Sequence, residues 1–270
     1  GFSSYAKTIT LDFIGVTLRL FQSLGNLTGS MNQIINSHVH IEKFYELDNN
    51  RVELKKENFQ IHSNDTVEFE NLNFRYFNSD VDIFENLSFV IKKNNHVLVT
   101  GPNGSGKSTL LGLIAGVLFS NSGKVKSFSN KFGYIGATPL IFESTLFENL
   151  TYGNNKNVSE DEILTFLKML DTFKEQENYD LSRVINNKSL SSGQMQKIAF
   201  IRALLSDIEI LLLDEATANL DDASKDKIFD ILHERKITII NSTHDPESFG
   251  NVDGNLKINI IDEKRIITLT

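Results

Sequence analysis

The stretch Gly101-Pro102-Asn103-Gly104-Ser105-Gly106-Lys107-Ser108 decides which fold this sequence adopts. It lies between an apolar run, His96–Thr100, and a segment of helical pattern that begins near Lys107, so we expect it to join a strand to a helix. Its glycines let successive backbone N–H groups point into one concavity, and the N-terminus of the following helix adds positive potential. The stretch therefore predicts a phosphate-binding loop.

Two side chains of this loop have specific expected roles. The Lys107 ammonium can reach the β- and γ-phosphates of a nucleotide, and the Ser108 hydroxyl can ligate Mg²⁺. An ordinary glycine-rich turn is the alternative, which the strand–loop–helix context disfavours. The residues expected around the triphosphate are Gly101, Asn103, Gly104, Ser105, Gly106, Lys107, Ser108 and Thr109.

Composition limits the kind of protein. The 270 residues include 27 Lys+Arg against 35 Asp+Glu, for a formal net charge of −8, and 40% of the residues are hydrophobic. These values are typical of a globular protein and exclude a wholly disordered chain. A pI near 5.3 argues against a protein that coats nucleic acid, since such binding uses clustered Lys and Arg. The absence of cysteine excludes disulfides, Cys-ligated zinc and thiol catalysis.

The first part of the chain has a different character. Ala6–Leu47 contains no proline and carries apolar residues at helical spacing, which predicts one long helix. Two interpretations stay open at this point: a surface amphipathic or coiled-coil helix, or the last, partly polar helix of a membrane bundle. No uninterrupted apolar run of 18 residues is present. Because residue 1 is Gly rather than Met, we expect the sequence to be a fragment or a processed product.

A polar stretch, Asp48–Asn64, separates this helix from strand patterns that later alternate with helical ones. The runs Ile208–Leu213 and Ile237–Ile240 are continuously apolar, as expected of parallel strands buried on both faces. Strands are expected at Val67–Phe69, Phe74–Tyr76, Leu87–Ile91, His96–Thr100, Ile208–Leu213, Ile237–Ile240, Leu256–Ile261 and Arg265–Leu269, and helices at Lys107–Leu118, Glu160–Leu170, Gly193–Leu205 and Ser224–His233.

The strand pattern Ile208–Leu213 is followed by two acids, Asp214 and Glu215. Asp214 would hold Mg²⁺, through water, and Glu215 would polarise the water that attacks the γ-phosphate. A buried strand that ends in two acids is common, so the pair is a weak signal by itself. Its place downstream of a phosphate loop makes it a candidate for the catalytic pair.

Five elements follow one another as they do in a known family. They are the phosphate loop, the segment Leu190-Ser191-Ser192-Gly193-Gln194, the pair Asp214-Glu215, the loop Asn219-Leu220-Asp221 and the lone histidine His244. From about Val67 to His244 the sequence therefore resembles the nucleotide-binding domain of ATP-binding cassette (ABC) proteins. The resemblance implies an α/β P-loop NTPase cassette, with a mostly parallel core sheet, an antiparallel β subdomain and a helical subdomain, preceded here by the long N-terminal helix. It also implies ATP and Mg²⁺ as cofactors.

The resemblance implies roles for individual residues. Glu215, His244 and Lys107 would be catalytic, with His244 as the switch histidine on the γ-phosphate. Tyr76 would stack on adenine, and Asp221 would contact a second cassette. The simpler alternatives are a core tyrosine for Tyr76 and a polar surface residue for His244.

The segment Leu190–Gln194 corresponds to the family's signature. Through Ser191, Ser192, Gly193 and Gln194 it would act on the ATP of the partner subunit, so that nucleotide binding closes a dimer. A simple helix cap at Ser191 is the alternative, and both roles are compatible.

The segment Phe142–Gly153 resembles the exporter branch of the family, and so does a long helix joined directly to the cassette. Residues 1–58 are therefore expected to be the end of a transmembrane domain with its linker, and residues 59–270 the nucleotide-binding domain. The implied protein is a multi-pass half-transporter of the plasma (inner) membrane, with its cassette on the cytoplasmic side. Its partners would be a second half-transporter, identical or different, and an unidentified transported substrate, and no nucleic acid.

Three departures from the family's pattern bear on activity. Ala137 stands where a glutamine that contacts Mg²⁺ and the attacking water is expected, Ser192 replaces a signature glycine, and Arg183–Lys188 lacks the usual Gly-Glu pattern. Because Glu215 and His244 are both present, an ATPase that powers export is the leading hypothesis. Two alternatives stay open: a nucleotide-gated module with weak or no hydrolysis, and a soluble ABC ATPase not engaged in transport.

Overall fold

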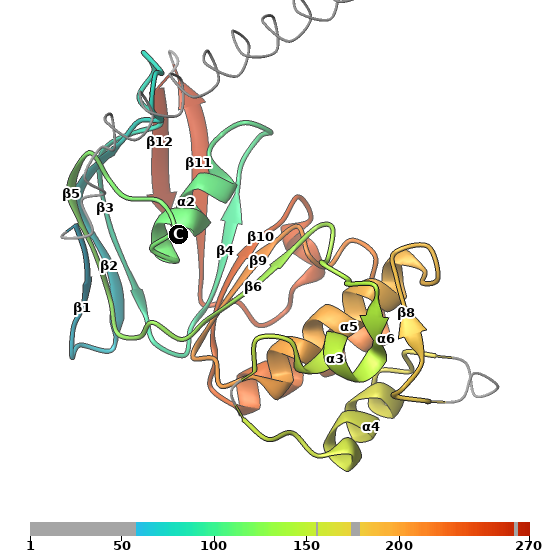
Figure 1. The fold of residues 1–270 in the computed structure, drawn as a ribbon. Helices are drawn as coiled ribbons and strands as arrows, with labels where there is room; N and C mark the ends of the chain where they lie inside the picture. The colour runs from blue at the N-terminus through green and yellow to red at the C-terminus, as the bar shows by residue number, and fades with distance from the viewer. Residues whose placement is uncertain (1–57, 155, 174–178, 262–263) are drawn as a thin grey trace, which may run out of the picture. The chain divides into compact units, whose positions relative to one another are not determined.

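The computed structural model describes residues 58–154, 156–173, 179–261 and 264–270 (Figure 1). The chain divides into two compact units, Gly1–Leu54 and Lys55–Thr270, and all the described residues belong to the second. The predicted helix over Ala6–Leu47 falls outside them and stays a prediction. In the part of the chain that the structure covers, no helix is long and apolar enough to cross a membrane.

A six-stranded sheet forms the centre of the second unit, with the strand order β12-β11-β4-β10-β9-β6. Neighbours from β11 to β6 are parallel, and β12 pairs antiparallel with β11. The strands are β4 (His96–Thr100), β6 (Phe132–Gly136), β9 (Ile210–Asp214), β10 (Thr238–Ser242), β11 (Gly254–Ile261) and β12 (Lys264–Leu269). The mostly parallel sheet predicted from the apolar runs is confirmed.

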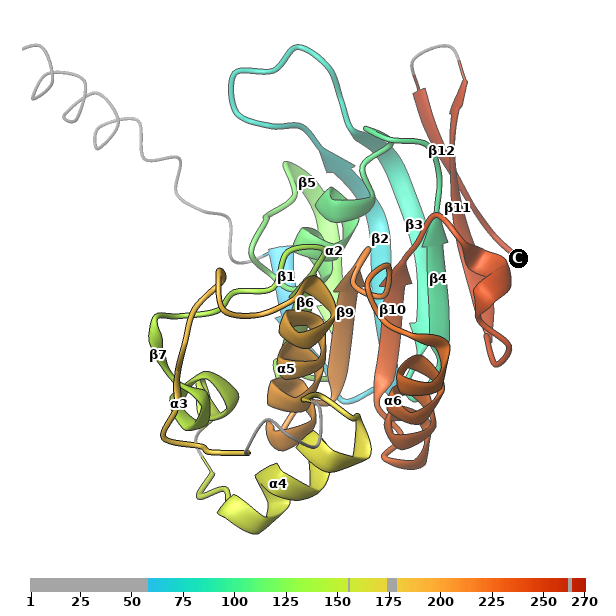
Figure 2. The same ribbon diagram turned by 90° about the vertical axis from the view of Figure 1, so that its right-hand side faces the viewer.

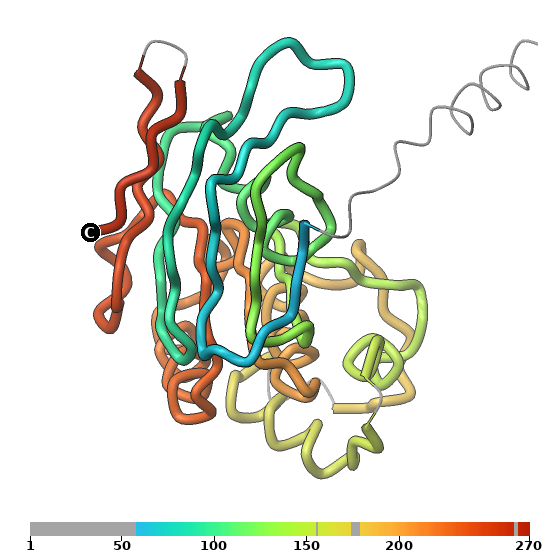
Figure 3. Tube along the Cα trace, turned by 90° about the vertical axis from the view of Figure 1, so that its left-hand side faces the viewer, coloured from blue at the N-terminus to red at the C-terminus, as the bar shows by residue number. Residues whose placement is uncertain are grey.

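A second sheet is mostly antiparallel and has the order β1-β5-β2-β3 (Figure 3). Its strands are β1 (Phe59–Ile61), β2 (Thr66–Phe74), β3 (Phe84–Lys92) and β5 (Ser122–Ser127). Helix α2 (Lys107–Ile114) packs between the two sheets, because its Leu110, Leu113 and Ile114 share one buried cluster with residues of both. This cluster anchors the helix that follows the phosphate loop.

Of the remaining described helices, α5 (Ser192–Leu205) and α6 (Asp222–Glu234) pack on the opposite side of the central sheet, and α3 (Leu146–Thr151) and α4 (Glu160–Met169) pack on α5 (Figure 2). The structure also has the short strands β7 (Ser144–Thr145) and β8 (Val184–Ile185) and the 3₁₀ helix η2 (Pro246–Ser248). Strand β9 contributes to both cores: Leu211 and Leu213 pack with the helices, and Leu212 packs with α2. Burial on both faces explains why this strand is continuously apolar.

Two predicted elements end two or more residues earlier in the structure. The helix predicted to reach Leu118 ends at Ile114, because Gly116 has φ +66°, a left-handed conformation that stops a helix. The strand predicted at Phe74–Tyr76 is the end of one longer strand, β2, which stops at Phe74 and has register shifts on both sides of Leu72. Tyr76 therefore lies in the loop after the strand, close to α2.

Candidate functional site

The carboxyl ends of four neighbouring parallel strands meet at one edge of the central sheet. The phosphate loop follows β4, Ser242 ends β10, Asp214 ends β9 and Gly136 ends β6, and the register pairs Ser242 with both Val99 and Asp214. Such an edge is where open α/β sheets bind ligands. The structure therefore brings the phosphate loop, the two acids and the segment around His244 to one place.

The phosphate loop depends on its glycines. Gly106 has φ +102°, and a Cβ on it would lie 3.0 Å from Phe84 Cζ, so neither the conformation nor the space suits another residue. Gly104 has φ +74° and lies exposed at the loop's outer side. The loop can thus present its backbone to a ligand, as the sequence predicted.

Lys107 is the cationic centre of the loop. Its side chain is only 5% exposed, and Nζ donates hydrogen bonds to the backbone oxygens of Gly101, at 3.0 Å, and Pro102, at 3.3 Å. No carboxylate pairs with it within the part of the chain described. The buried Ser105 Oγ beside it has no hydrogen-bond partner in the structure. The Lys107 ammonium is buried with only carbonyl partners, and the Ser105 hydroxyl is buried with none. Both groups suit an anionic ligand such as a triphosphate.

Two further loop residues lie where the sequence expects them. The Ser108 side chain is exposed at the start of α2, free to face a metal ion. Thr109 Oγ1 and the Tyr76 hydroxyl are hydrogen-bonded at 2.8 Å, and the Tyr76 ring packs edge-on against Phe74 with 5.0 Å between centroids. The ring is 44% exposed, so Tyr76 is a half-open aromatic surface beside the loop rather than a core residue.

The acid Asp214 has a partner that the sequence did not indicate. Tyr134, on β6, donates a hydrogen bond from its hydroxyl to Asp214 Oδ2 at 3.2 Å. Partial burial, and next to it the negative charge of Asp214, raise the pKa of the Tyr134 hydroxyl. The phenol therefore stays protonated and can act as the donor in this pair.

Glu215 and His244 form a direct pair. His244 Nε2 lies 2.7 Å from Glu215 Oε1, and both side chains are about half exposed. Glu215 has φ +56°, and its N–H donates to Ser242 O at 2.9 Å, which fixes the turn after β9 against the end of β10. A left-handed conformation at a non-glycine residue carries strain, and such strain is concentrated at functional sites.

A hollow of about 270 Å³ lies between His244 and the start of the phosphate loop. Its lining includes His244 and Gly101, together with Thr100, Thr243, Pro246, Asn255 and Lys257. The structure thus places His244 beside the first glycine of the loop, which the sequence could order along the chain but not in space.

Ala137 follows the end of β6 and is exposed, with a methyl side chain that offers no hydrogen bond. The residue before it, Gly136, is tied to α5 because Gln196 Nε2 donates to the Gly136 oxygen at 3.3 Å. The segment that carries Ala137 is therefore fastened to the helix that begins at the signature.

The signature residues open helix α5. Ser191 is the N-cap: its Oγ accepts from Gln194 N–H at 3.2 Å, and Gln194 Oε1 accepts from Ser191 N–H at 2.9 Å, a capping box. A Cβ on Gly193 would lie 3.0 Å from Asn219 O, so the loop Asn219–Asp221 packs closely on the signature. Ser191 and Ser192 are exposed, and no hydrogen bond or ion pair of the described chain joins them to the phosphate loop.

Asp221 is held by Lys197 of α5, with 2.9 Å between Nζ and Oδ2. Its carboxylate also accepts from Ser224 N–H at 2.8 Å and so caps α6. The Lys197 hydrogen bond, supported by Ser224, lowers the pKa of Asp221 to about 2. The loop expected to contact a second cassette is thereby fixed to the signature helix.

Arg265 is a second residue of the site that no motif indicated. From β12 its guanidinium donates to the backbone oxygens of Gly104, at 3.5 Å, and Asp82, at 3.3 Å. It therefore links the phosphate loop to the turn before β3. Only the pairing of β12 with β11, which itself pairs with β4, brings it there.

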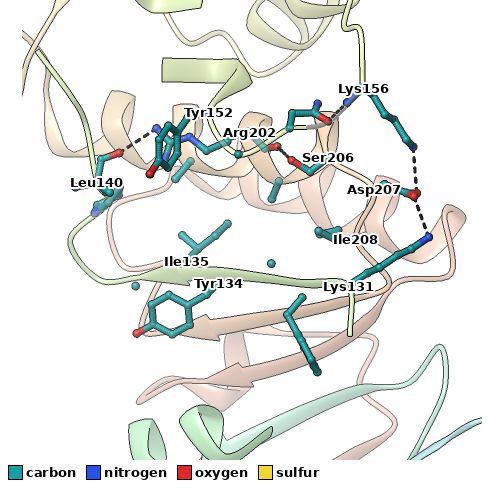
Figure 4. Close-up of a pocket in the computed structure, with 18 of the residues that line it drawn as sticks. Lys131, Tyr134, Ile135, Leu140, Tyr152, Lys156, Arg202, Ser206, Asp207 and Ile208 are labelled. Carbon is teal, nitrogen blue, oxygen red and sulfur yellow. Dashed lines mark hydrogen bonds and ion pairs between the residues drawn. The ribbon is translucent and has the colours of Figure 1, made fainter. Parts of the chain in front are cut away.

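A larger cavity of about 680 Å³ lies beside the edge strand β6 (Figure 4). Tyr134 lines one end of it, and at the other end Asp207 pairs with Lys131, at 2.9 Å, and with Lys156, at 3.1 Å. Arg202 of α5 forms part of its wall and donates to Asn149 O at 2.7 Å and to Leu140 O at 3.0 Å. The exposed rings of Tyr134 and Tyr152 and the Leu140 side chain give the cavity an apolar rim.

This geometry agrees with the comparisons with known proteins. The family model described as "ABC transporter" matches residues 84–218, half of the 270-residue chain. The chain belongs to the ABC transporter family. Its fold is accordingly the ABC cassette, a domain that binds ATP.

Similar proteins in the family are of several kinds. The lactococcin-A transport/processing ATP-binding protein LcnC of Lactococcus lactis subsp. lactis is 33% identical over 193 residues, which cover 66% of this chain and 27% of that protein. The ATP-dependent lipid A-core flippase of Methylobacillus flagellatus is 29% identical over 198 residues, 66% of this chain and 33% of the flippase. The probable iron export ATP-binding protein FetA of Escherichia coli is 29% identical over 181 residues, 61% of this chain and 79% of FetA. The chain thus spans about a quarter to a third of the first two.

A solved structure of a bacterial Atm1-family ABC exporter with ATP bound is similar in fold. The TM-score is 0.68 at 23% sequence identity, over 84% of this chain and 43% of that one. At this identity the likeness is one of fold, and it confirms the predicted cassette architecture.

Proposed function

We propose that this chain hydrolyses ATP at the edge formed by β4, β10 and β9, and that hydrolysis powers export of a substrate across a membrane. The observation that carries the catalytic part is the Glu215–His244 pair, 2.7 Å apart beside the phosphate loop. The export part is supported by the names of relatives, among them a transport/processing protein, a flippase and an iron export protein. These relatives differ in what their names say they transport, so the proposal covers export but no particular substrate.

Binding of the nucleotide is assigned to the loop. Lys107 would move its ammonium from the carbonyls of Gly101 and Pro102 to the β- and γ-phosphates, while the backbone of the loop cradles the chain of phosphates. The half-open ring of Tyr76 would stack on adenine. Its hydroxyl bond to Thr109 would hold the ring at the start of α2.

Mg²⁺ would be held by the exposed Ser108 hydroxyl and, through water, by the partly exposed Asp214 carboxylate. Both groups offer the oxygen ligands that this ion prefers. When bound, it would neutralise charge that develops on the phosphate oxygens. The Glu215 carboxylate would accept a hydrogen bond from the attacking water and so polarise it. His244 would orient the Glu215 carboxylate and reach the γ-phosphate.

A second cassette would complete the site. Ser191, Ser192, Gly193 and Gln194 open α5 on an exposed surface, which supports contact with ATP of a partner subunit. The Lys197–Asp221 pair supports this role, because it makes the signature and the Asn219–Asp221 loop one stiff surface. The partner would be a second half-transporter, identical or different.

The membrane domain would act through the cavity beside β6. Its apolar rim lies next to Ala137, and the Gln196–Gly136 hydrogen bond leads from there to the signature helix. Residues 1–58 are proposed to be the end of that domain and its linker, with the whole protein multi-pass in the plasma (inner) membrane and the cassette on the cytoplasmic side.

Phosphate release tests the catalytic proposal. Glu215→Gln keeps the shape of the side chain and removes its charge, so we expect turnover to fall about 10²–10⁴-fold, the contribution of a general base. Glu209→Gln is the matched control, since Glu209 lies just before β9 at the opposite end of the strand and pairs with Lys131. Equal turnover in all three proteins would refute Glu215 as the catalytic carboxylate.

A second candidate function is favoured by Ala137. Without a polar side chain at this position, the cassette would close on ATP and open with little hydrolysis, as a nucleotide-gated module. ATP-dependent dimerisation with negligible phosphate release would favour the module, whereas brisk release would exclude it.

A further inference from the structure

An exposed tyrosine, Tyr134, lies beside Asp214 on the strand that leads to Ala137. Tyr134 and Gly136 belong to the same strand, and a Cβ on Gly136 would lie 3.4 Å from both the hydroxyl and Cε1 of Tyr134. The ring therefore leans along the strand over Gly136, toward the carboxyl edge of the sheet. Its hydroxyl ends 3.2 Å from Asp214 Oδ2.

The strand register makes this contact possible. β6 pairs in parallel with β9, so that Gly136 lies opposite Asp214 and Tyr134 lies opposite Leu212. A tyrosine two residues before the strand end is long enough to reach the acid at the end of the neighbouring strand. A shorter side chain at 134 would not span this distance.

The hydrogen bond leaves both partners usable. A phenol donates one proton and keeps two lone pairs, so Tyr134 can donate to Asp214 and still accept from a water molecule at the open edge. Asp214 Oδ1 has no hydrogen bond within the described chain, so this oxygen stays available to a ligand. Since 61% of the Tyr134 side chain is exposed, such a water has access to it.

We propose that Tyr134 is a positioning residue of the metal site: its hydroxyl fixes the Asp214 carboxylate and supplies the polar contact that Ala137 cannot make. This inference rests on the proposed ATP and Mg²⁺ site. It goes further by identifying how this chain compensates for a missing glutamine.

The test measures how strongly Mg²⁺ supports nucleotide binding. The 270-residue chain is titrated with Mg²⁺ at a fixed concentration of a fluorescent ATP analogue, and the same binding is measured in EDTA. In Tyr134→Phe we expect the Mg²⁺ concentration for half-maximal binding to rise about 10-fold, the effect of one lost hydrogen bond to a charged group. Binding in EDTA and the melting temperature should stay unchanged.

Tyr152→Phe is the matched control. Tyr152 lines the same cavity and is 55% exposed, but no hydrogen bond of its hydroxyl occurs among the described residues. Its Mg²⁺ dependence should equal that of the unaltered chain. Adding Ala137→Gln to Tyr134→Phe should restore the dependence, because it returns a polar side chain just after the end of the same strand.

Three outcomes would overturn the inference. Tyr134→Phe could match Tyr152→Phe in its Mg²⁺ dependence, which would make Tyr134 a cavity-lining residue only. It could weaken binding equally in EDTA and in Mg²⁺, which would indicate a general loss of structure. If the unaltered chain bound no nucleotide, the proposed function would fall first and the inference with it.

Discussion

Lys107 offers the sharpest prediction, because its replacement should affect stability and ligand binding very differently. Lys107 is only 5% exposed. Its Nζ donates hydrogen bonds to two backbone oxygens, at 3.0 and 3.3 Å. In Lys107→Met two hydrogen bonds are lost, but the cost of burying an uncompensated charge is also removed. These effects oppose each other, so we predict that the free energy of unfolding changes by no more than about 1 kcal/mol.

The affinity for ATP should fall much further. Two unit charges about 4 Å apart attract by about 4 kcal/mol at an effective dielectric constant near 20. Some of this is offset by the carbonyl contacts that Lys107 makes without nucleotide. We therefore predict a loss of about 2–4 kcal/mol, or roughly 30- to 1,000-fold in Kd.

Calorimetric titration with Mg-ATP gives the affinity, and thermal unfolding without nucleotide gives the stability. Lys227→Met is the control, since Lys227 carries the same charge on the exposed face of α6. It should leave the affinity within about twofold, as expected of a surface charge far more screened than a buried one. A large fall in melting temperature with little change in affinity would show instead that Lys107 is a structural lysine.

Three other changes test separate parts of the structure. Burial, and after it the charge of His233, lowers the pKa of His96 to about 4, whereas the unfolded chain has a value near 6.5, so the unfolded chain takes up the proton first as the pH falls. We predict that this lowers the free energy of unfolding, measured by urea denaturation, by about 3 kcal/mol between pH 7 and pH 4, and that His96→Phe shows correspondingly less of the decline. In Lys197→Met an NMR titration should show the pKa of Asp221 rising from about 2 toward its ordinary range, and an unchanged pKa would contradict the pairing. The free energy of unfolding should fall by only about 1 kcal/mol, because the Asp221 side chain is 55% exposed. Arg265→Met should weaken ATP binding about 3- to 10-fold by releasing the phosphate loop from β12, and unchanged affinity would show that this link is dispensable.

The sequence was most informative where local chemistry determines the structure. Glycine at 106 is required by the φ of +102°, and Ile210–Leu213 is apolar because both faces of β9 are buried. Patterns of this kind are visible along the chain, and they were sufficient to predict the phosphate loop, the parallel sheet and the acids at its edge.

The contacts that the sequence could not reveal depend on which strands become neighbours. Tyr134 meets Asp214 only because β6 pairs with β9, and Arg265 meets Gly104 only because β12 and β11 extend the sheet beyond β4. The early end of α2 at Ile114 was missed for another reason: apolar residues continue to Leu118, and they concealed the left-handed turn at Gly116.

The most direct test of the account is the identity of the nucleotide that remains bound after the chain is mixed with Mg-ATP. We expect ADP on the unaltered chain and intact ATP on Glu215→Gln, because the carboxylate paired with His244 activates the attacking water. Intact ATP on both proteins would contradict hydrolysis at this site. ADP formed equally fast on both would contradict the role of Glu215.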